Sequence, residues 1–143
     1  GYLNREEVTA EAIVDGWLKT GDIGLLDAEG YLYLVDSKKD TIIVSVFNVF
    51  PTDIEDVIIE IPGAEEVGVV GMPDKKSGER SVAFVVNADK AITEEEIISY
   101  CHTKLTNYKI PREVRFISIL PKSPVGKVLR RVLRDETHQE EGK

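Results

Sequence analysis

Two short segments carry side chains whose types could act on a charged ligand. Asp22 follows Thr20 and Gly21, and a carboxylate at such a turn can accept hydrogen bonds with both of its oxygens. Lys127 follows Gly126, and an ammonium group on a long, flexible stem can stabilise negative charge. On local sequence alone, a turn residue and a solvated lysine are the simpler interpretations, so wider patterns have to decide between them.

The charge balance limits the partners of the chain. Of its 143 residues, 42% are hydrophobic, as in a globular protein with a core, and the formal net charge is −8. Nucleic acids and anionic membranes are held by clustered Lys and Arg. We therefore expect no nucleic-acid partner, and any phosphate chemistry has to depend on locally placed cations.

The single cysteine and the hydropathy pattern indicate a cytoplasmic protein. Cys101 has no second cysteine to pair with, which fits a reducing compartment and a structural role. No apolar run approaches the roughly 20 residues that span a bilayer, so we expect no integral membrane segment, while peripheral contact with a membrane stays open. Because the chain opens at Gly1 within a patterned segment, we also expect it to be a piece of a longer protein.

A helix and a hairpin should position the first of the two segments. Asn4 and Glu7 have the spacing of a capping box, which predicts a short helix over residues 6–13. Two β-rich runs and the glycine-bearing turn between them predict a hairpin: residues 23–26, 27–30 and 31–35. The polar, charged residues 36–40 that follow form a candidate hinge or domain boundary.

A second series of alternating strands and helices should position the lysine segment. The predicted strands are residues 41–47, 67–71, 82–86 and 114–119. Helices are predicted after Pro51, after a capping box of Thr93 and Glu96, and over residues 128–135. The first two have apolar faces: Ile54, Val57, Ile58 and Ile61 in one, and Ile97, Cys101 and Leu105 in the other. This alternation predicts a compact sheet with helices packed on it.

Four segments in a fixed order carry a resemblance to a known family. They are residues 16–22 (GWLKTGD), 31–40 (YLYLVDSKKD), 44–55 (VSVFNVFPTDIE) and 120–131 (LPKSPVGKVLRR). Together they resemble the adenylate-forming superfamily of acyl-CoA synthetases, peptide-synthetase adenylation domains and luciferases, and within it bacterial fatty-acyl-CoA ligases. The resemblance implies an α+β fold with a small mixed sheet and helices packed on it, preceded by a short helix and a β-hairpin.

The resemblance also implies how the chain is divided. In such enzymes a large N-terminal domain holds the phosphate-binding loop and most of the acid pocket, and a small C-terminal domain closes over it. Residues 1–36 would be the end of the large domain, 37–40 the hinge, 41–136 the mobile C-terminal domain and 137–143 a frayed tail. Because the phosphate loop and the acid pocket lie elsewhere, we expect this chain alone to be inactive.

Both candidate segments acquire roles from the resemblance. Asp22 matches the aspartate that accepts hydrogen bonds from the ribose hydroxyls of ATP, and Thr20 and Gly21 shape the same loop. Lys127, with Gly126 before it, matches the lysine that reaches the active site during adenylation and stabilises the charge that develops as the carboxylate attacks the α-phosphate. Mg²⁺ is expected with ATP, but its ligands would lie outside this chain, so no metal site is assigned here.

The resemblance assigns the second half-reaction to a different loop. Lys39 matches the hinge position about which the small domain rotates between half-reactions. One state presents the catalytic lysine, and the other swings residues 44–48 toward the acyl-adenylate. In that state Val46, Phe47 and Asn48 would line the pantetheine tunnel of CoA.

Two positions depart from the family pattern. Ser37 stands where the family usually has an arginine that contacts the ribose, so we expect weaker ATP binding. Val46 stands where glycine usually lies beside the pantetheine. Because valine adds an isopropyl group and disfavours positive φ, we expect thioester formation to suffer more than adenylation. An adjusted partner domain or a divergent paralogue of altered activity would each account for both changes.

Three functions follow as alternatives. The first is an ATP-dependent fatty-acid–CoA ligase that acts through an acyl-adenylate. The second is an adenylating enzyme that loads a carrier-protein thiol, which the acidic surface slightly disfavours. The third is a degenerate, non-catalytic module that binds adenylate or acyl ligands, motivated by Ser37 and Val46. The retained Asp22, Gly126 and Lys127 favour the ligase.

Overall fold

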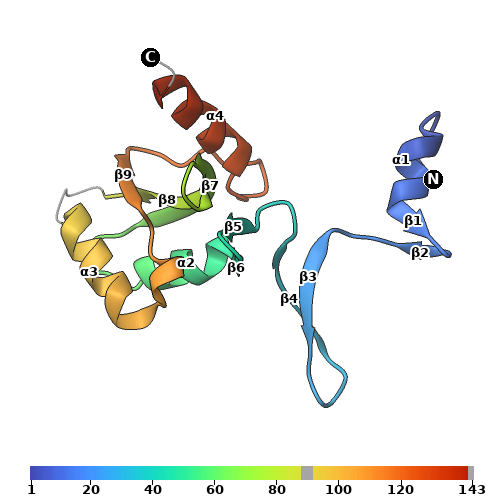
Figure 1. The fold of residues 1–143 in the computed structure, drawn as a ribbon, viewed down its shortest axis with the longest axis horizontal. Helices are drawn as coiled ribbons and strands as arrows, with labels where there is room; N and C mark the ends of the chain where they lie inside the picture. Colours follow the sequence, from blue (N-terminus) through green and yellow to red (C-terminus); the bar gives the residue numbers. More distant parts are fainter. Residues whose placement is uncertain (88–91, 142–143) are drawn as a thin grey trace. The chain divides into compact units, whose positions relative to one another are not determined.

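Contacts between residues divide the chain into two units. The computed structural model describes residues 1–87 and 92–141, and its units are Gly1–Lys39 and Asp40–Lys143. The boundary therefore falls inside the charged stretch 36–40. Figure 1 shows the elements of each unit.

The first unit begins with a helix that is not capped as predicted. Its first elements are α1 (Glu6–Ala12), β1 (Ile13–Val14) and β2 (Trp17–Leu18), and the two strands form a short antiparallel ladder. The helix is confirmed, but the capping box of Asn4 and Glu7 is wrong. Arg5 is the N-cap, and no side chain caps the helix. Asn4 lies one residue too early and has a positive φ of 56°.

The predicted hairpin of the first unit is confirmed. β3 (Asp22–Leu26) pairs antiparallel with β4 (Leu32–Ser37), with an irregularity after Ile23. The Asp27 carboxylate closes the turn because its Oδ1 accepts hydrogen bonds from the N–H groups of Glu29 and Tyr31, at 3.1 and 2.8 Å. An aspartate that bonds its own backbone in this way is a common turn residue.

A five-stranded mixed sheet forms the centre of the second unit. Its strands are β5 (Ile42–Val44), β6 (Phe47–Val49), β7 (Glu66–Asp74), β8 (Gly78–Val86) and β9 (Glu113–Ile117). β7 and β8 form a long antiparallel hairpin, and β9 runs parallel to β8 on its other side. The β5–β6 hairpin joins the start of β8, where Val44 pairs with Gly78.

The single strand that we predicted over residues 41–47 is wrong. The segment turns at Ser45 and Val46, so that Val44 of β5 pairs with Phe47 of β6. Ser45 takes a positive φ of 58°, and its N–H donates to the carbonyl oxygen of Ser77 at 2.6 Å. The turn lacks the Gly, Asn or Asp that usually marks a two-residue hairpin loop, which is why the pattern did not reveal it.

Helices cover both faces of this sheet (Figure 1). They are α2 (Pro51–Ile58), α3 (Glu94–Lys104) and α4 (Arg130–Glu141), with a 3-10 turn, η1 (Asn107–Lys109), after α3. On the face of α2 and α3, the buried cluster includes Ile54, Ile58, Val69, Ala83, Val85, Ile97 and Cys101. On the face of α4, it includes Val70, Met72, Val82, Phe84, Leu120 and Leu133. Alternate residues of β7 and β8 thus serve two cores, as the pleat of a strand requires.

The ends of two helices differ in how well the sequence predicted them. The capping box of α3 is confirmed, since Thr93 and Glu96 bond each other's backbone N–H groups. α4 continues through Thr137 to Glu141, where we expected the chain to fray. Thr137 is buried, and its Oγ1 donates to the Leu133 carbonyl oxygen at 2.8 Å. Within the described ranges, no helix is both long enough and apolar enough to cross a membrane.

Candidate functional site

The β3–β4 hairpin brings the two predicted ribose-contact positions together. Asp22 and Ser37 are direct partners across the two strands. The N–H of Lys38 donates to the carbonyl oxygen of Gly21 at 2.8 Å, which extends the pairing by one residue. Gly21 has a φ of 83°, a left-handed conformation that favours glycine, and Thr20 Oγ1 accepts from the Asp22 N–H at 3.2 Å. These backbone contacts therefore fix the position of the Asp22 Cα atom, from which the carboxylate side chain extends.

The Asp22 carboxylate is on the surface of the first unit. Its residue is exposed, whereas Ser37 opposite is half-buried. An exposed carboxylate can take two hydroxyl donors of a ligand, one on each oxygen. A serine at the neighbouring position has a short, uncharged side chain, so it cannot supply the charged hydrogen bond of an arginine.

Lys127 lies in a tight hairpin between β9 and α4. Lys122 and Val128 form an antiparallel bridge. Between them, the Ser123 N–H donates to the Lys127 carbonyl oxygen and the Gly126 N–H donates to the Ser123 carbonyl oxygen, both at 2.8 Å. Gly126 has a φ of 83°, so the loop is a three-residue hairpin loop whose last residue is left-handed. Glycine is needed there for its backbone conformation.

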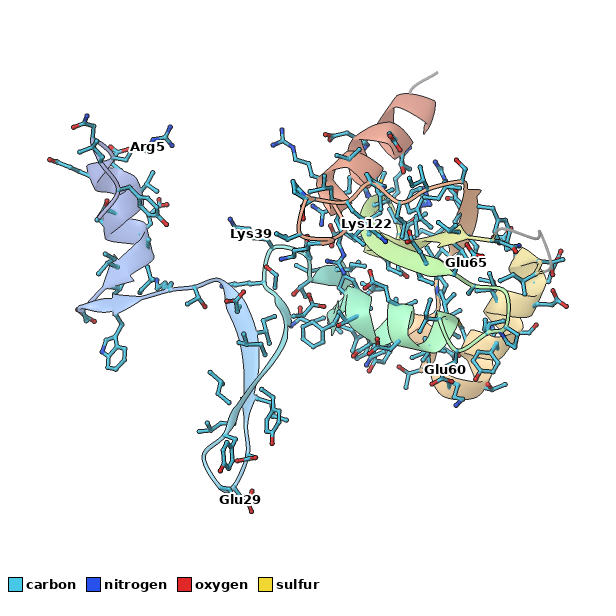
Figure 2. The ribbon with its side chains drawn as sticks, turned by 180° about the vertical axis from the view of Figure 1, so that it is seen from behind. Arg5, Glu29, Lys39, Glu60, Glu65 and Lys122 are labelled. Carbon is cyan, nitrogen blue, oxygen red and sulfur yellow. The ribbon has the colours of Figure 1, made fainter. Side chains whose placement is uncertain are left out.

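The side chain of Lys127 is available for chemistry. It is exposed, and within residues 1–87 and 92–141 it makes no side-chain hydrogen bond or ion pair. Lys122 of the same hairpin, labelled in Figure 2, pairs instead with the Glu66 carboxylate. Of the two lysines, Lys122 thus attaches the hairpin to β7, and Lys127 stays exposed.

A cluster of ion pairs beside this hairpin in the chain was not predicted from sequence. Arg130 Nη2 donates to both carboxylate oxygens of Glu55, at 2.8 and 2.9 Å, and its Nη1 lies 3.5 Å from Asp40 Oδ2. Arg134 Nη2 donates to Asp40 Oδ1 at 2.8 Å. The partners are separated by 75 and 94 residues, and such distances leave no local spacing to detect. The basic run of residues 130–134 was the one available signal.

The β5–β6 turn carries the residues predicted to face pantetheine. Val46 is 86% exposed and Asn48 is also exposed. The ring of Phe47 stacks on Tyr108 of η1, with ring centroids 4.2 Å apart and the planes 9° apart. Among described non-glycine residues, positive φ occurs at Ser45 of this turn and not at Val46. Val46 thus lacks the positive φ that glycine would allow, as expected for valine, and its effect on thioester formation stays a prediction.

Lys39 is exposed and is the last residue of the first unit (Figure 2). It lies in a turn of residues 38–40, directly before the boundary between the units. Asp40, the next residue, already belongs to the ion-pair cluster of the second unit. The boundary between the units thus falls within residues 37–40, and the role of Lys39 as a hinge stays a prediction.

Comparison with known proteins identifies the family. Residues 53–127, from α2 to the lysine hairpin, match the AMP-binding enzyme C-terminal domain. The chain belongs to this family. The predicted resemblance to adenylate-forming enzymes is thereby confirmed.

Relatives of this AMP-binding enzyme C-terminal domain are ligases. A long-chain-fatty-acid–CoA ligase of Escherichia coli O6:H1 is 53% identical over 136 residues, which are 95% of this chain and 24% of the relative. The long-chain-fatty-acid–CoA ligase FadD13 of Mycobacterium tuberculosis is 48% identical over 94% of this chain and 27% of its own length. ATP-bound MatB from Rhodopseudomonas palustris is 35% identical, with a TM-score of 0.92 over 100% of this chain and 29% of that chain. The predicted α+β fold is confirmed, and the chain spans about a quarter of the curated relatives.

In the described part of the AMP-binding enzyme C-terminal domain, no three His, Cys, Asp or Glu side chains are arranged to hold a metal ion, so no chemical step is assigned to a metal held here.

The single cysteine of the domain has a structural environment. Cys101 is fully buried, and burial raises the pKa of its thiol to about 11. A protonated, inaccessible thiol has a packing role and is a poor nucleophile.

Proposed function

We propose that this domain is the C-terminal part of an ATP-dependent fatty-acid–CoA ligase. The names of relatives at 53% and 48% identity support the substrate class. One observation carries the mechanism: the Lys127 side chain is exposed, has no hydrogen bond or ion pair with any residue that the structure describes, and extends from a hairpin held by backbone hydrogen bonds. ATP and CoA are the co-substrates, with Mg²⁺ bound by the rest of the enzyme. The cytoplasm, where Cys101 stays reduced, is the proposed location.

The first half-reaction uses Asp22 and Lys127. Asp22 accepts hydrogen bonds from the ribose hydroxyls of ATP and so orients the nucleotide. A carboxylate oxygen of the fatty acid attacks the α-phosphorus, the bond from phosphorus to the bridging oxygen breaks, and pyrophosphate leaves. The Lys127 ammonium stabilises the negative charge that develops on the oxygens between acid and phosphorus. The product is an acyl-adenylate.

The second half-reaction uses the β5–β6 turn. Rotation about Lys39 withdraws Lys127 and brings Val46, Phe47 and Asn48 to the pantetheine of CoA. The thiol sulfur attacks the acyl carbonyl carbon, its proton passes to solvent, and AMP leaves with the electrons of the broken carbon–oxygen bond. The stack of Phe47 on Tyr108 supports this assignment because it holds the turn in one conformation.

The test measures the two half-reactions separately in the whole enzyme that contains this chain. Lys127→Ala should reduce fatty-acid-dependent ATP–pyrophosphate exchange by about 100-fold or more, the usual effect of removing one group that stabilises transition-state charge. Acyl-CoA formation from a preformed acyl-adenylate should change little. Lys75→Ala, in the exposed turn between β7 and β8, is the matched control and should leave both rates unchanged. Unchanged exchange in Lys127→Ala would refute the assignment.

The same assays decide between the alternatives. Exchange without acyl-CoA formation in the unaltered enzyme would favour an adenylating enzyme that loads a carrier-protein thiol, to be checked with a carrier protein as acceptor. The absence of activity in both assays over a panel of fatty acids would favour a non-catalytic binding module. Ser37 and Val46 motivate that last alternative, and activity in both assays would make them tolerated substitutions.

A further inference from the structure

The ion-pair cluster of Asp40, Glu55, Arg130 and Arg134 joins three distant parts of the second unit. Asp40 is the first residue of that unit, Glu55 lies in α2, and the two arginines lie in α4. The side chains of Arg130, Glu55 and Asp40 are 10%, 16% and 20% exposed. Ion pairs shielded to this degree are screened less by salt than surface pairs.

Arg130 is the centre of this cluster. Its Nη2 donates to both oxygens of Glu55, its Nε donates to the Val69 carbonyl oxygen at 3.2 Å, and its Nη1 faces Asp40. Glu55 Oε1 also accepts the Val69 N–H at 2.8 Å. A planar guanidinium whose three nitrogens face three different partners, Glu55, Val69 and Asp40, has a fixed orientation, which a lysine ammonium would not have. Arg130 is therefore locked against both α2 and β7.

A short, bonded segment connects this locked residue to Lys127. Arg130 follows Lys127 by three residues. The Leu129 N–H donates to the Pro121 carbonyl oxygen at 2.8 Å. The Ser123 N–H donates to the Lys127 carbonyl oxygen, and the Ser123 Oγ accepts the Lys127 N–H. These hydrogen bonds restrict movement of the Lys127 backbone relative to the Arg130 guanidinium. The orientation of Arg130 thus sets the position from which the Lys127 side chain extends.

We propose that Arg130 is a positioning residue for adenylation. Through Glu55 it fixes the hairpin on the body of the domain, and through Asp40 it fixes that hairpin to the first residue after Lys39. Rotation about Lys39 then carries Lys127 as part of a rigid body. This inference rests on the proposed function of Lys127.

The β5–β6 turn has a separate anchor, which makes the proposal testable. That turn is held by the stack of Phe47 on Tyr108, and η1 is held in turn by the Lys109–Asp53 ion pair at 2.6 Å. None of these residues belongs to the cluster around Arg130. Loss of one anchor should therefore impair one half-reaction and spare the other, whereas a general loss of folding would impair both.

The experiment compares Arg130→Lys, Glu55→Gln and Tyr108→Ala in the whole enzyme. A displacement of about 1 Å at a catalytic group costs on the order of 100-fold in rate. We expect ATP–pyrophosphate exchange to fall by tenfold to 100-fold in Arg130→Lys and Glu55→Gln, while acyl-CoA formation from preformed acyl-adenylate stays within about twofold. Tyr108→Ala should give the opposite pattern. Arg115→Lys, which loosens a half-buried pair with Glu113 on β9, is the matched control and should change neither rate.

The outcomes that would overturn the positioning role of Arg130 differ from those that would overturn the proposed ligase function. Equal loss of both half-reactions in Arg130→Lys would show a structural role alone, and no loss would show no role. If the unaltered enzyme has neither activity, the proposed function fails, and amide hydrogen exchange then tests the anchor by itself. Arg130→Lys should speed exchange at Gly126 and Leu129 by at least tenfold relative to Phe47, and equal rates would contradict the anchor.

Discussion

Replacement of Gly126 by alanine should slow adenylation by an amount that follows from the hairpin geometry. Gly126 has a φ of 83°, and a Cβ built there would meet nothing within 4 Å, so no clash adds to the cost. An L-residue in the left-handed conformation costs about 1–2 kcal/mol. The Gly126 N–H donates to the Ser123 carbonyl oxygen within the loop, so this cost acts directly on the loop conformation that positions Lys127. The population with Lys127 correctly placed should fall by up to about 5- to 30-fold.

Gly78 offers a matched control for this change. Its φ is 80°, and a Cβ there would lie 3.7 Å from the Ile43 carbonyl oxygen, an ordinary contact. Gly78→Ala therefore carries a similar backbone cost in the β7–β8 turn, in the same unit but outside the lysine hairpin. ATP–pyrophosphate exchange at saturating ATP and thermal unfolding should be measured for both variants. Gly126→Ala should lower the exchange rate, and Gly78→Ala should lower the melting temperature without slowing exchange.

A third variant tests whether the loss of exchange in Gly126→Ala comes from the left-handed backbone conformation at that position. Gly126→Asn should keep more of the exchange rate than Gly126→Ala, because asparagine visits the left-handed conformation more readily. Equal exchange rates in Gly126→Ala and Gly78→Ala would refute the reasoning, since the hairpin would then have no special connection to adenylation. A melting temperature that falls in Gly126→Ala with exchange intact would refute it as well.

Three further predictions concern single side chains. Ser37→Arg, opposite Asp22 in the β3–β4 hairpin, should tighten ATP binding by about 1–3 kcal/mol in calorimetric titration of the whole enzyme, and unchanged affinity would show that the arginine contact is not missing. Val46→Gly should speed acyl-CoA formation from preformed acyl-adenylate without changing ATP–pyrophosphate exchange, because it removes an isopropyl group at an 86% exposed turn position; a change in both rates would contradict this. Because burial raises the pKa of Cys101 from 9.0 to about 11, the unfolded thiol loses its proton first, and the free energy of unfolding should fall between pH 9 and pH 11 by up to about 3 kcal/mol. Denaturant titrations across that range should show a weaker pH dependence in Cys101→Ala, and identical curves would rule out this contribution.

Sequence patterns predicted most elements of the second unit because its strands and helices have strong local signals. The capping box of Thr93 and Glu96 was predicted correctly, since both residues stand at the required positions around the start of α3. The same spacing at Asn4 and Glu7 gave a wrong cap, because a spacing does not show where a helix begins. The turn at Ser45 was missed because a backbone bond to Ser77, distant in sequence, helps to hold it.

Lys127 and Asp22 were assigned as site residues through the family resemblance of their segments, because on local sequence alone a solvated lysine and a turn residue are the simpler interpretations. The structure adds that Gly126 and Lys127 lie in a hairpin built from adjacent residues. The contacts of Arg130 with Glu55 and of Arg134 with Asp40 depend on the folded sheet, which brings together residues 75 and 94 positions apart. A single sequence contains no spacing that encodes such pairs. The contacts that attach the lysine hairpin to the rest of the unit could therefore be found only from the structure.

The pairing of Arg134 with Asp40 bears on how such enzymes can be recombined. It fastens the last helix to the residue at which the second unit begins. A crossover between Lys39 and Asp40 would therefore transfer the lysine hairpin, the β5–β6 turn and both of their anchors as one cassette. A crossover a few residues later would separate Asp40 from its arginines. Protein chimeras joined at the earlier point should keep these contacts intact, and, on the function proposed above, the new large domain would then supply the acid pocket.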